Sequence, residues 1–179
     1  MSKDDFEKLK NFTKSVVDKF GISELGPHLA VVEYGKEPTV KIYLGDHTDP
    51  KSLKEAIDTI EPSGSVGVAT DKALEVAVKD VFSSENGGRP SVPNVVILLT
   101  DDRSTGDKSP EETTEDLEKA GVRVVVVGIG SNTNEDELKE LVTKSGDLVK
   151  VENVGNVTNA SSRVVDVVKQ GTKESKWKR

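Results

Sequence analysis

The sequence predicts an α/β fold, with a doubly wound and mostly parallel sheet that carries helices on both faces. Residues 95–100 (VVILLT) and 122–130 (VRVVVVGIG) are nearly continuous apolar runs, which is typical of strands covered on both sides. Segments with apolar residues at helical spacing separate these runs from the other strand-like segments. Strands that alternate with helices in this way form a parallel sheet wrapped by helices.

Each element has its own signal in the sequence. Asp49 and Ser109 each precede a proline, as N-cap residues do when proline occupies the first helical position. Gly21 is a stop signal for the first helix. We expect helices at 4–20, from 50 to about 60, at 70–82, 110–120, from 134 to about 142 and at 157–169, and strands at 29–34, 40–44, 95–100, 122–130 and 148–154.

The composition indicates one globular domain. The chain has 179 residues, which is enough for a single domain with a buried core. A net charge of -7 argues against nucleic acid as a partner. No apolar run approaches the roughly 20 residues of a membrane helix, so we expect no membrane insertion. The absence of cysteine excludes disulfides, thiolate metal sites and a cysteine nucleophile.

The two ends of the chain differ in character. The N-terminal MSKDDFEKLK lacks the apolar core and the cleavage site of a signal peptide. The C-terminal KESKWKR is basic and is typical of a solvated end. We therefore expect one domain over residues 1–170 and a basic tail over residues 171–179.

Four segments resemble von Willebrand factor type A domains. They are NGGRPSVPNVVILLTDDRS at 86–104, AGVRVVVVGIG at 120–130, GVATDKAL at 67–74 and FEKLKNFTKSVVDKF at 6–20. Together they span nearly the whole chain, and they are most similar to the extracellular matrix branch of the family, such as matrilins and collagen-associated A domains. The resemblance implies the doubly wound fold and a metal-ion-dependent adhesion site at the carboxyl ends of the strands.

The chain departs from the family at its start. Family members begin with an apolar strand that ends in Asp-x-Ser-x-Ser, and here Met1-Ser2 stand where that motif should just have ended. The motif occurs nowhere else in the chain. We therefore expect an N-terminally truncated sheet without its central strand, with a gap between the strands at 29–34 and 95–100. Buried unpaired backbone groups cost about 1–3 kcal/mol each, so the resemblance predicts marginal stability or recruitment of a strand from another chain.

The metal site that the resemblance implies is degenerate in this sequence. The family's first metal-site Thr falls on Val68, and the Gly of its Thr-Asp-Gly motif is Asp102. Asp101 alone keeps a carboxylate at a matching position. Its role is either that of a metal ligand or that of a structural residue that caps backbone N–H groups at the end of the strand. We expect weak Mg²⁺ or Ca²⁺ binding or none, unless a longer protein supplies the missing motif.

The same edge of the sheet is the expected partner-binding surface. We name it the rim, formed by residues 62–70, residues 101–109 and the loop that follows Gly130. Ligands of open parallel sheets bind beyond the carboxyl ends of the strands. The predicted partner-binding residues are Ser65, Thr70, Asp101, Arg103 and Asn132.

The predicted function is a non-enzymatic, protein-binding adhesion module, because no catalytic constellation is visible in the sequence. The resemblance implies a protein ligand, collagen or another matrix protein, and an extracellular location as part of a longer protein. The open sheet also offers a route to a homo-oligomer. The alternative is an intracellular scaffold domain of a multiprotein complex, a role that many family members have.

Overall fold

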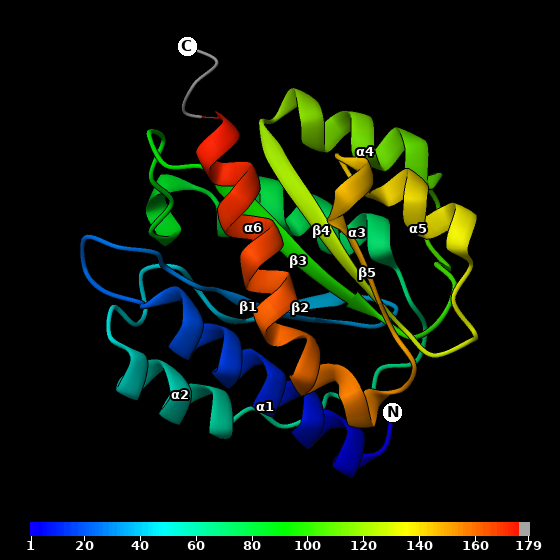
Figure 1. Cartoon of the computed structure of the whole chain (residues 1–179), viewed down its shortest axis with the longest axis horizontal. Helices are drawn as coiled ribbons and strands as arrows, with labels where there is room; N and C mark the ends of the chain where they lie inside the picture. Colours follow the sequence, from blue (N-terminus) through cyan, green and yellow to red (C-terminus); the bar gives the residue numbers. More distant parts are fainter. Residues whose placement is uncertain (176–179) are drawn as a thin grey trace.

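The computed structural model describes residues 1–175 and has the predicted elements in the predicted order (Figure 1). The helices are α1 (Lys3–Phe20), α2 (Pro50–Asp58), α3 (Thr70–Val76), α4 (Pro110–Lys119), α5 (Glu135–Leu141) and α6 (Ser161–Ser175). The strands are β1 (Val31–Tyr34), β2 (Pro38–Ile42), β3 (Asn94–Thr100), β4 (Val122–Ile129) and β5 (Leu148–Val151).

The predicted helix starts are confirmed in atomic detail. Asp49 accepts a hydrogen bond from the Ser52 N–H, and Pro50 follows it at the first helical position. Ser109 and Glu112 form a reciprocal capping box ahead of α4. Gly21 ends α1 with a φ of 70°, a left-handed conformation that glycine adopts without steric cost.

Two helical segments differ from the prediction. The helix expected at 70–82 changes at Ala77 into one turn of π-helix, η1 (Ala77–Val81). The last helix begins earlier, as the 3₁₀ segment η4 (Val154–Ala160), and α6 then continues to Ser175, so the predicted tail at 171–179 begins inside a helix. The rest of that tail, residues 176–179, lies outside the described residues.

The strands form two separate sheets, which confirms the predicted gap. β3, β4 and β5 pair in parallel, and β1 pairs with β2 antiparallel. Within residues 1–175 no strand pairing joins β1 to β3. The link across the gap is made by a side chain, because the Tyr34 hydroxyl donates to the Leu99 carbonyl oxygen at 3.1 Å.

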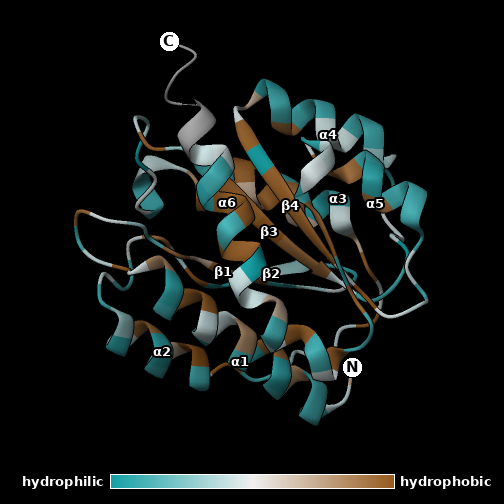
Figure 2. Ribbon diagram, viewed as in Figure 1, coloured by the Kyte–Doolittle hydropathy of each residue, from teal (hydrophilic) through white to brown (hydrophobic). Residues whose placement is uncertain are grey.

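Helices cover both faces of the larger sheet. α1 and α6 pack against one face, in a cluster that includes Phe12, Val125 and Val165. α3, α4 and α5 pack against the other face, around Leu74, Leu117 and Leu138. Figure 2 shows the hydrophobic colour concentrated on β3 and β4 and the hydrophilic colour on the outer sides of the helices. The core is therefore centred on β4, where residues 124–127 are 0% exposed.

The first and last helices contact each other directly. Ser15 and Ser161 join their hydroxyls at 2.8 Å, and the Lys169 ammonium donates to the Lys19 carbonyl oxygen at 2.9 Å. The same ammonium lies 5.9 Å from the centre of the Phe20 ring. On its other side α1 packs against α2 and the β1–β2 hairpin, where Leu53 is fully buried.

The gap between the sheets encloses a cavity of about 1060 Å³. We name this cavity the slot. It lies between β1 and β3, with α1 on one side and α3 with η1 on the other. The bordering strand β1 is less well covered than β4, because all four of its residues are only half-buried.

No helix within residues 1–175 combines the length and the apolar character needed to cross a membrane.

Candidate functional site: the rim at the carboxyl ends of the strands

The first two loops of the rim are joined by hydrogen bonds. The Thr105 N–H donates to the Val68 carbonyl oxygen at 2.8 Å, and the Val68 N–H donates to the Thr105 hydroxyl at 3.0 Å. The Ser104 hydroxyl donates to the same carbonyl oxygen at 3.2 Å. Residues 62–70 and 101–109 therefore form one connected surface beyond the end of β3 (Figure 1).

A buried carboxylate at the start of α3 anchors the second loop. Asp71 Oδ2 accepts the backbone N–H groups of Asp107 at 2.9 Å and Lys108 at 3.0 Å. The side chain approaches the loop so closely that a Cβ at Gly106 would lie 1.9 Å from Asp71 Oδ1. Burial alone would raise the pKa of Asp71, but the backbone N–H donors outweigh it and hold the pKa below its ordinary value.

The third loop of the rim is positioned by α5. Asn134 caps this helix by accepting the N–H groups of Asp136 and Glu137. The Glu137 carboxylate in turn accepts the Ser104 N–H at 2.7 Å, so the helix after the third loop contacts the second loop. This contact is charge-assisted, and such hydrogen bonds are the stronger kind. All three predicted loops therefore meet at one edge of the molecule.

Four of the predicted partner-binding residues are on the surface. Ser65, Asp101, Arg103 and Asn132 are all exposed. The Ser65 hydroxyl also accepts the Lys36 N–H at 3.1 Å, which ties its loop to the turn after β1.

Thr70 differs from the prediction. It is only 3% exposed, so its side chain faces the interior and is not available to a partner. Its position explains this burial, because the first residue of α3 lies beneath the 101–109 loop that Asp71 anchors.

The interior beneath the rim is organised around Tyr34. Burial raises the pKa of its phenol to about 12. Hydrogen bonds with the Thr100 and Thr70 hydroxyls lower the pKa of Tyr34 in part, whereas the negative charge of Asp101 raises it further. The phenol is therefore a neutral hydrogen-bond donor at physiological pH, and Thr70 serves this interior cluster.

The oxygen atoms at the rim bear on the predicted Mg²⁺ or Ca²⁺ site. Such ions take about six or more oxygen ligands, usually including carboxylates. Asp101 provides one carboxylate at the strand end, whereas Val68 contributes no side-chain oxygen and Glu137 is engaged by the Ser104 N–H. Within residues 1–175 no three His, Cys, Asp or Glu side chains are grouped closely enough to hold a metal ion.

Sequence reasoning did not identify the residues that hold the rim together. These residues are Asp71 and Glu137, each in the first turn of a helix. An acidic residue in a first helical turn is commonly explained by its own helix N-terminus, so neither position signalled a contact with the 101–109 loop.

Comparisons with known proteins agree with this architecture. The family model of the von Willebrand factor type A domain matches residues 1–169. Matrilin-3 of Gallus gallus is 33% identical over 130 residues, which cover 71% of this chain and 28% of the relative. The chain thus spans less than a third of that relative's length.

Solved structures of proximal thread matrix protein 1 (PTMP1) from the mussel byssus are also similar. One has a TM-score of 0.88 with 23% identity and covers 93% of this chain and 43% of that chain, which supports the fold alone. Another, described with a zinc-occupied MIDAS motif, has a TM-score of 0.82 with 31% identity, covering 91% and 40%. Because the family model matches nearly all of the sequence, the chain belongs to the von Willebrand factor type A domain family.

Proposed function

We propose that this chain is a non-enzymatic protein-binding module of an extracellular matrix protein, and that its partner binds at the rim. The observation that carries this proposal is the set of hydrogen bonds that join residues 62–70 to residues 101–109. Loops that are tied together present their exposed side chains in one arrangement, which lowers the entropic cost of binding. Ser65, Asp101, Arg103 and Asn132 are the exposed polar groups that the partner meets.

The partner in this proposal is a protein, with collagen or another matrix protein as the ligand class. The matrix relatives favour an extracellular location over the intracellular scaffold alternative. Metal contributes little in the chain as it stands, because Asp101 is the one carboxylate at a position that matches the family's metal site. The rim then binds by direct polar contacts of Asp101 and Arg103 rather than through a shared ion.

A binding assay with substituted chains tests the role of the rim. Immobilised triple-helical collagen serves as the probe, and the chain carries Asp101→Ala, Arg103→Ala or Asn132→Ala. Lys41→Ala and Lys150→Ala are the controls, because both lysines lie on strands rather than in the loops of the rim. We expect each rim substitution to weaken binding at least about fivefold, as for central interface residues, and the controls to change it less than twofold.

Two results would count against the proposal. Equal losses from the control and rim substitutions would move the binding surface elsewhere on the molecule. A correctly folded chain that binds no collagen would remove collagen as the ligand and leave the other matrix proteins to be tried with the same variants.

A further inference from the structure

The sequence carries three acceptor triplets for N-linked glycans, and they come from opposite ends of the chain. Such a triplet is Asn-x-Ser or Asn-x-Thr, with x other than proline, and it is used in chains that enter the secretory pathway. The first triplet lies within α1, and the other two begin in η4. The three triplets are Asn11-Phe12-Thr13, Asn156-Val157-Thr158 and Asn159-Ala160-Ser161.

The fold brings these triplets together on one face. η4 packs along α1 and the Ser15 and Ser161 hydroxyls meet at 2.8 Å. The middle residues Phe12 and Val157 are 2% and 0% exposed, so both segments are anchored in the core. The asparagine of each triplet is nevertheless exposed. Triplets that arise by chance have no reason to share a face, whereas here all three acceptors are presented by one pair of packed helices.

The acceptor side chains make no contact that a glycan would break. Within residues 1–175 the side chains of Asn11, Asn156 and Asn159 have no hydrogen-bond partner. Other asparagines are engaged, because the Asn86 amide donates to a carboxylate of η1 at 2.7 Å and the Asn134 side chain caps α5. The folded chain can therefore carry a glycan at any of the three acceptors without losing a side-chain hydrogen bond.

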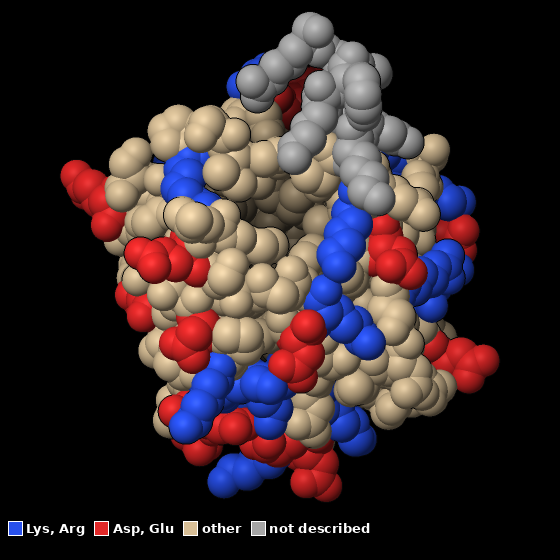
Figure 3. Space-filling model, turned by 60° about the vertical axis from the view of Figure 1, so that its left-hand side comes forward, with Lys and Arg blue, Asp and Glu red and all other residues tan. Residues whose placement is uncertain are grey.

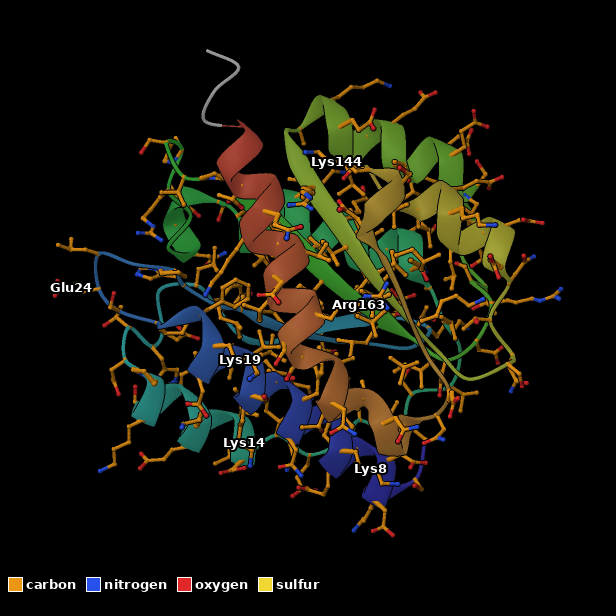
Figure 4. All side chains as sticks on the ribbon, viewed as in Figure 1. Lys8, Lys14, Lys19, Glu24, Lys144 and Arg163 are labelled. Carbon is orange, nitrogen blue, oxygen red and sulfur yellow. The ribbon has the colours of Figure 1, made fainter. Side chains whose placement is uncertain are left out.

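The surface around the acceptors is polar. Figure 3 shows Lys and Arg mixed with Asp and Glu over the lower part of the molecule, where α1 and α2 lie. One such pair, Lys14 with Asp58, joins these two helices. In Figure 4, Lys8 and Lys14 mark α1, and Arg163 lies near the start of α6, just after η4. Neither α1 nor η4, both within the described residues, exposes a large apolar side chain, so a hydrated glycan would cover no apolar patch there.

We propose that this surface, which we name the glycan face, carries one N-linked glycan on Asn11 and one on Asn156 or Asn159. The donor is an oligosaccharide held on a lipid pyrophosphate. The asparagine amide nitrogen bonds to the anomeric carbon of the sugar, the bond from that carbon to the pyrophosphate oxygen breaks, and solvent takes up the proton that the amide loses. η4 accepts one glycan at a time, because residues three apart in a 3₁₀-helix are eclipsed and lie only about 6 Å apart along its axis. The inference rests on the extracellular location in the proposed function.

The geometry of the triplets indicates that the transfer precedes folding. The transferring enzyme recognises the asparagine together with the hydroxyl two residues later. Successive residues of an α-helix are about 100° apart, so in α1 these two side chains point about 200° apart. The Thr13 hydroxyl donates to the Leu9 carbonyl oxygen at 2.9 Å, and Ser161 is only 2% exposed. The acceptors are therefore used while both segments are still extended, and the finished fold then displays the glycans.

The glycan face leaves the rim open. α1 and η4 pack on the side of the larger sheet that carries α6, whereas the rim loops contact Asp71 of α3 and Glu137 of α5 on the other side. Val154, the first residue of η4, lines a small cavity with Asp101, so the two surfaces are neighbours. Glycans are bulky and hydrated, so they would keep a protein partner off α1 and η4 and direct it to the rim.

Secretion of the full chain from cultured animal cells, behind a cleavable signal peptide, tests the inference. The intact mass is measured before and after treatment with peptide-N-glycosidase. We expect two glycans per chain, both released without denaturant because the acceptors are exposed. Release in heavy-oxygen water labels each asparagine that carried a glycan, because the enzyme converts it into aspartate.

Substitutions assign the glycans to the two segments. Asn11→Gln should remove one glycan, and the double variant Asn156→Gln with Asn159→Gln should remove the other. After deglycosylation both variants should unfold at the same temperature as the unsubstituted chain, because the acceptor side chains make no hydrogen bond within the described residues. Asn153→Gln is the matched control, because this exposed asparagine lies in the same segment outside any triplet, and it should keep both glycans.

Three results would overturn the inference, namely a secreted chain without glycans, glycans confined to one of the two segments, or three glycans on one chain. None of them bears on collagen binding at the rim, and a glycosylated chain that fails to bind collagen leaves the glycan count unchanged, so the two proposals fail separately. The same mass measurement on the protein isolated from its natural source tests the premise. A natural chain without glycans, beside a glycosylated chain from the cultured cells, would overturn the extracellular location and this inference with it.

Discussion

At the scale of single residues, Asp71 stabilises the rim through its ionised form. Its carboxylate accepts two backbone N–H groups of the 101–109 loop, and its pKa lies below the ordinary value of 3.8. A depressed carboxyl pKa contributes stability above the unfolded pKa, and that stability is lost as the pH falls through the folded value. The rim therefore loosens in acid, below about pH 4.

Replacing Asp71 tests this contribution. Asp71→Asn keeps the shape but loses the charge, so we expect a loss of about 1–3 kcal/mol of unfolding free energy at pH 7. The difference from the unsubstituted chain should shrink as the pH falls below 3.8, because protons then bind the unfolded chain in preference to the folded one. Urea unfolding at several pH values measures both effects. Asp107→Asn, an exposed change in the same loop, should cost little, and an equally small loss in Asp71→Asn would contradict the assigned role.

The ligand inventory around Asp101 leads to a prediction about metal. One carboxylate with bound waters is a poor site for an ion that holds its hydration shell tightly. A ligand present below its dissociation constant adds little stability, so millimolar Mg²⁺ or Mn²⁺ should not shift the thermal unfolding midpoint. A metal-dependent rise that Asp101→Ala abolishes would contradict this. A variant that adds an Asp-x-Ser-x-Ser strand ahead of Met1 and carries Val68→Thr is the positive control.

Asp101 could be located because it follows the apolar run at 95–100, and Val68 because residues 67–74 resemble the family. The contacts of Asp71 could not be located, because their partners lie 36 and 37 positions away in the chain. Thr70 could not be placed from the sequence either. A threonine at a helix start can be exposed or buried, and here the position of the 101–109 loop decides it. Strand order was predictable here, and the loops that fold back over the strand ends were not.

At the scale of elements, Arg123 of β4 forms a buried ion pair with Asp147, just ahead of β5, and also contacts the middle of α6. The Arg123 guanidinium contacts both oxygens of the Asp147 carboxylate, at 2.7 and 2.6 Å, and also donates to the carbonyl oxygens of Val167 and Val168. Gly171 makes room for it, because a Cβ there would lie 1.8 Å from the guanidinium. Gly171 therefore lies inside α6 at the point where the helix passes the guanidinium.

Breaking this pair should be costly. Asp147→Asn leaves the guanidinium buried without its counter-charge, and we expect a loss of about 3–5 kcal/mol of unfolding free energy. Chemical denaturation measures it. Glu135→Gln breaks exposed ion pairs with Lys139 and Lys150 and should change stability little. A loss from Asp147→Asn no larger than that from Glu135→Gln would show that solvent reaches the guanidinium.

At the scale of the whole molecule, the protein consists of two half-sheets held together by helices. β1 and β2 contact the rest through α1, α2 and α3 and through the Tyr34 hydrogen bond to β3, whereas β4 lies between two strands and two helix layers. The apolar strands near the middle of the chain made the larger sheet predictable. The absence of the central strand was predictable only from the family resemblance, because no local pattern reports a strand that is not there.

The two half-sheets should open independently. We expect the amides of Val31–Tyr34 to exchange with solvent at least about a hundredfold faster than those of Val124–Val127, because local opening of the hairpin breaks no backbone pairing with β3. Native-state hydrogen exchange followed by mass spectrometry or NMR makes the comparison. Equal protection in both segments would mean that the molecule unfolds as a single cooperative unit.

The contact between α1 and α6 has a consequence for the order in which the chain folds. The Ser15–Ser161 hydrogen bond joins residues that are synthesised 146 positions apart. Contacts of such long sequence separation form slowly, because a large loop must close first. During synthesis α1 leaves the ribosome long before α6 exists, and the part of its surface that packs on α6 stays exposed until α6 emerges. A nascent chain stalled before residue 161 should therefore bind chaperones through its first helix, and release should coincide with the appearance of its last one.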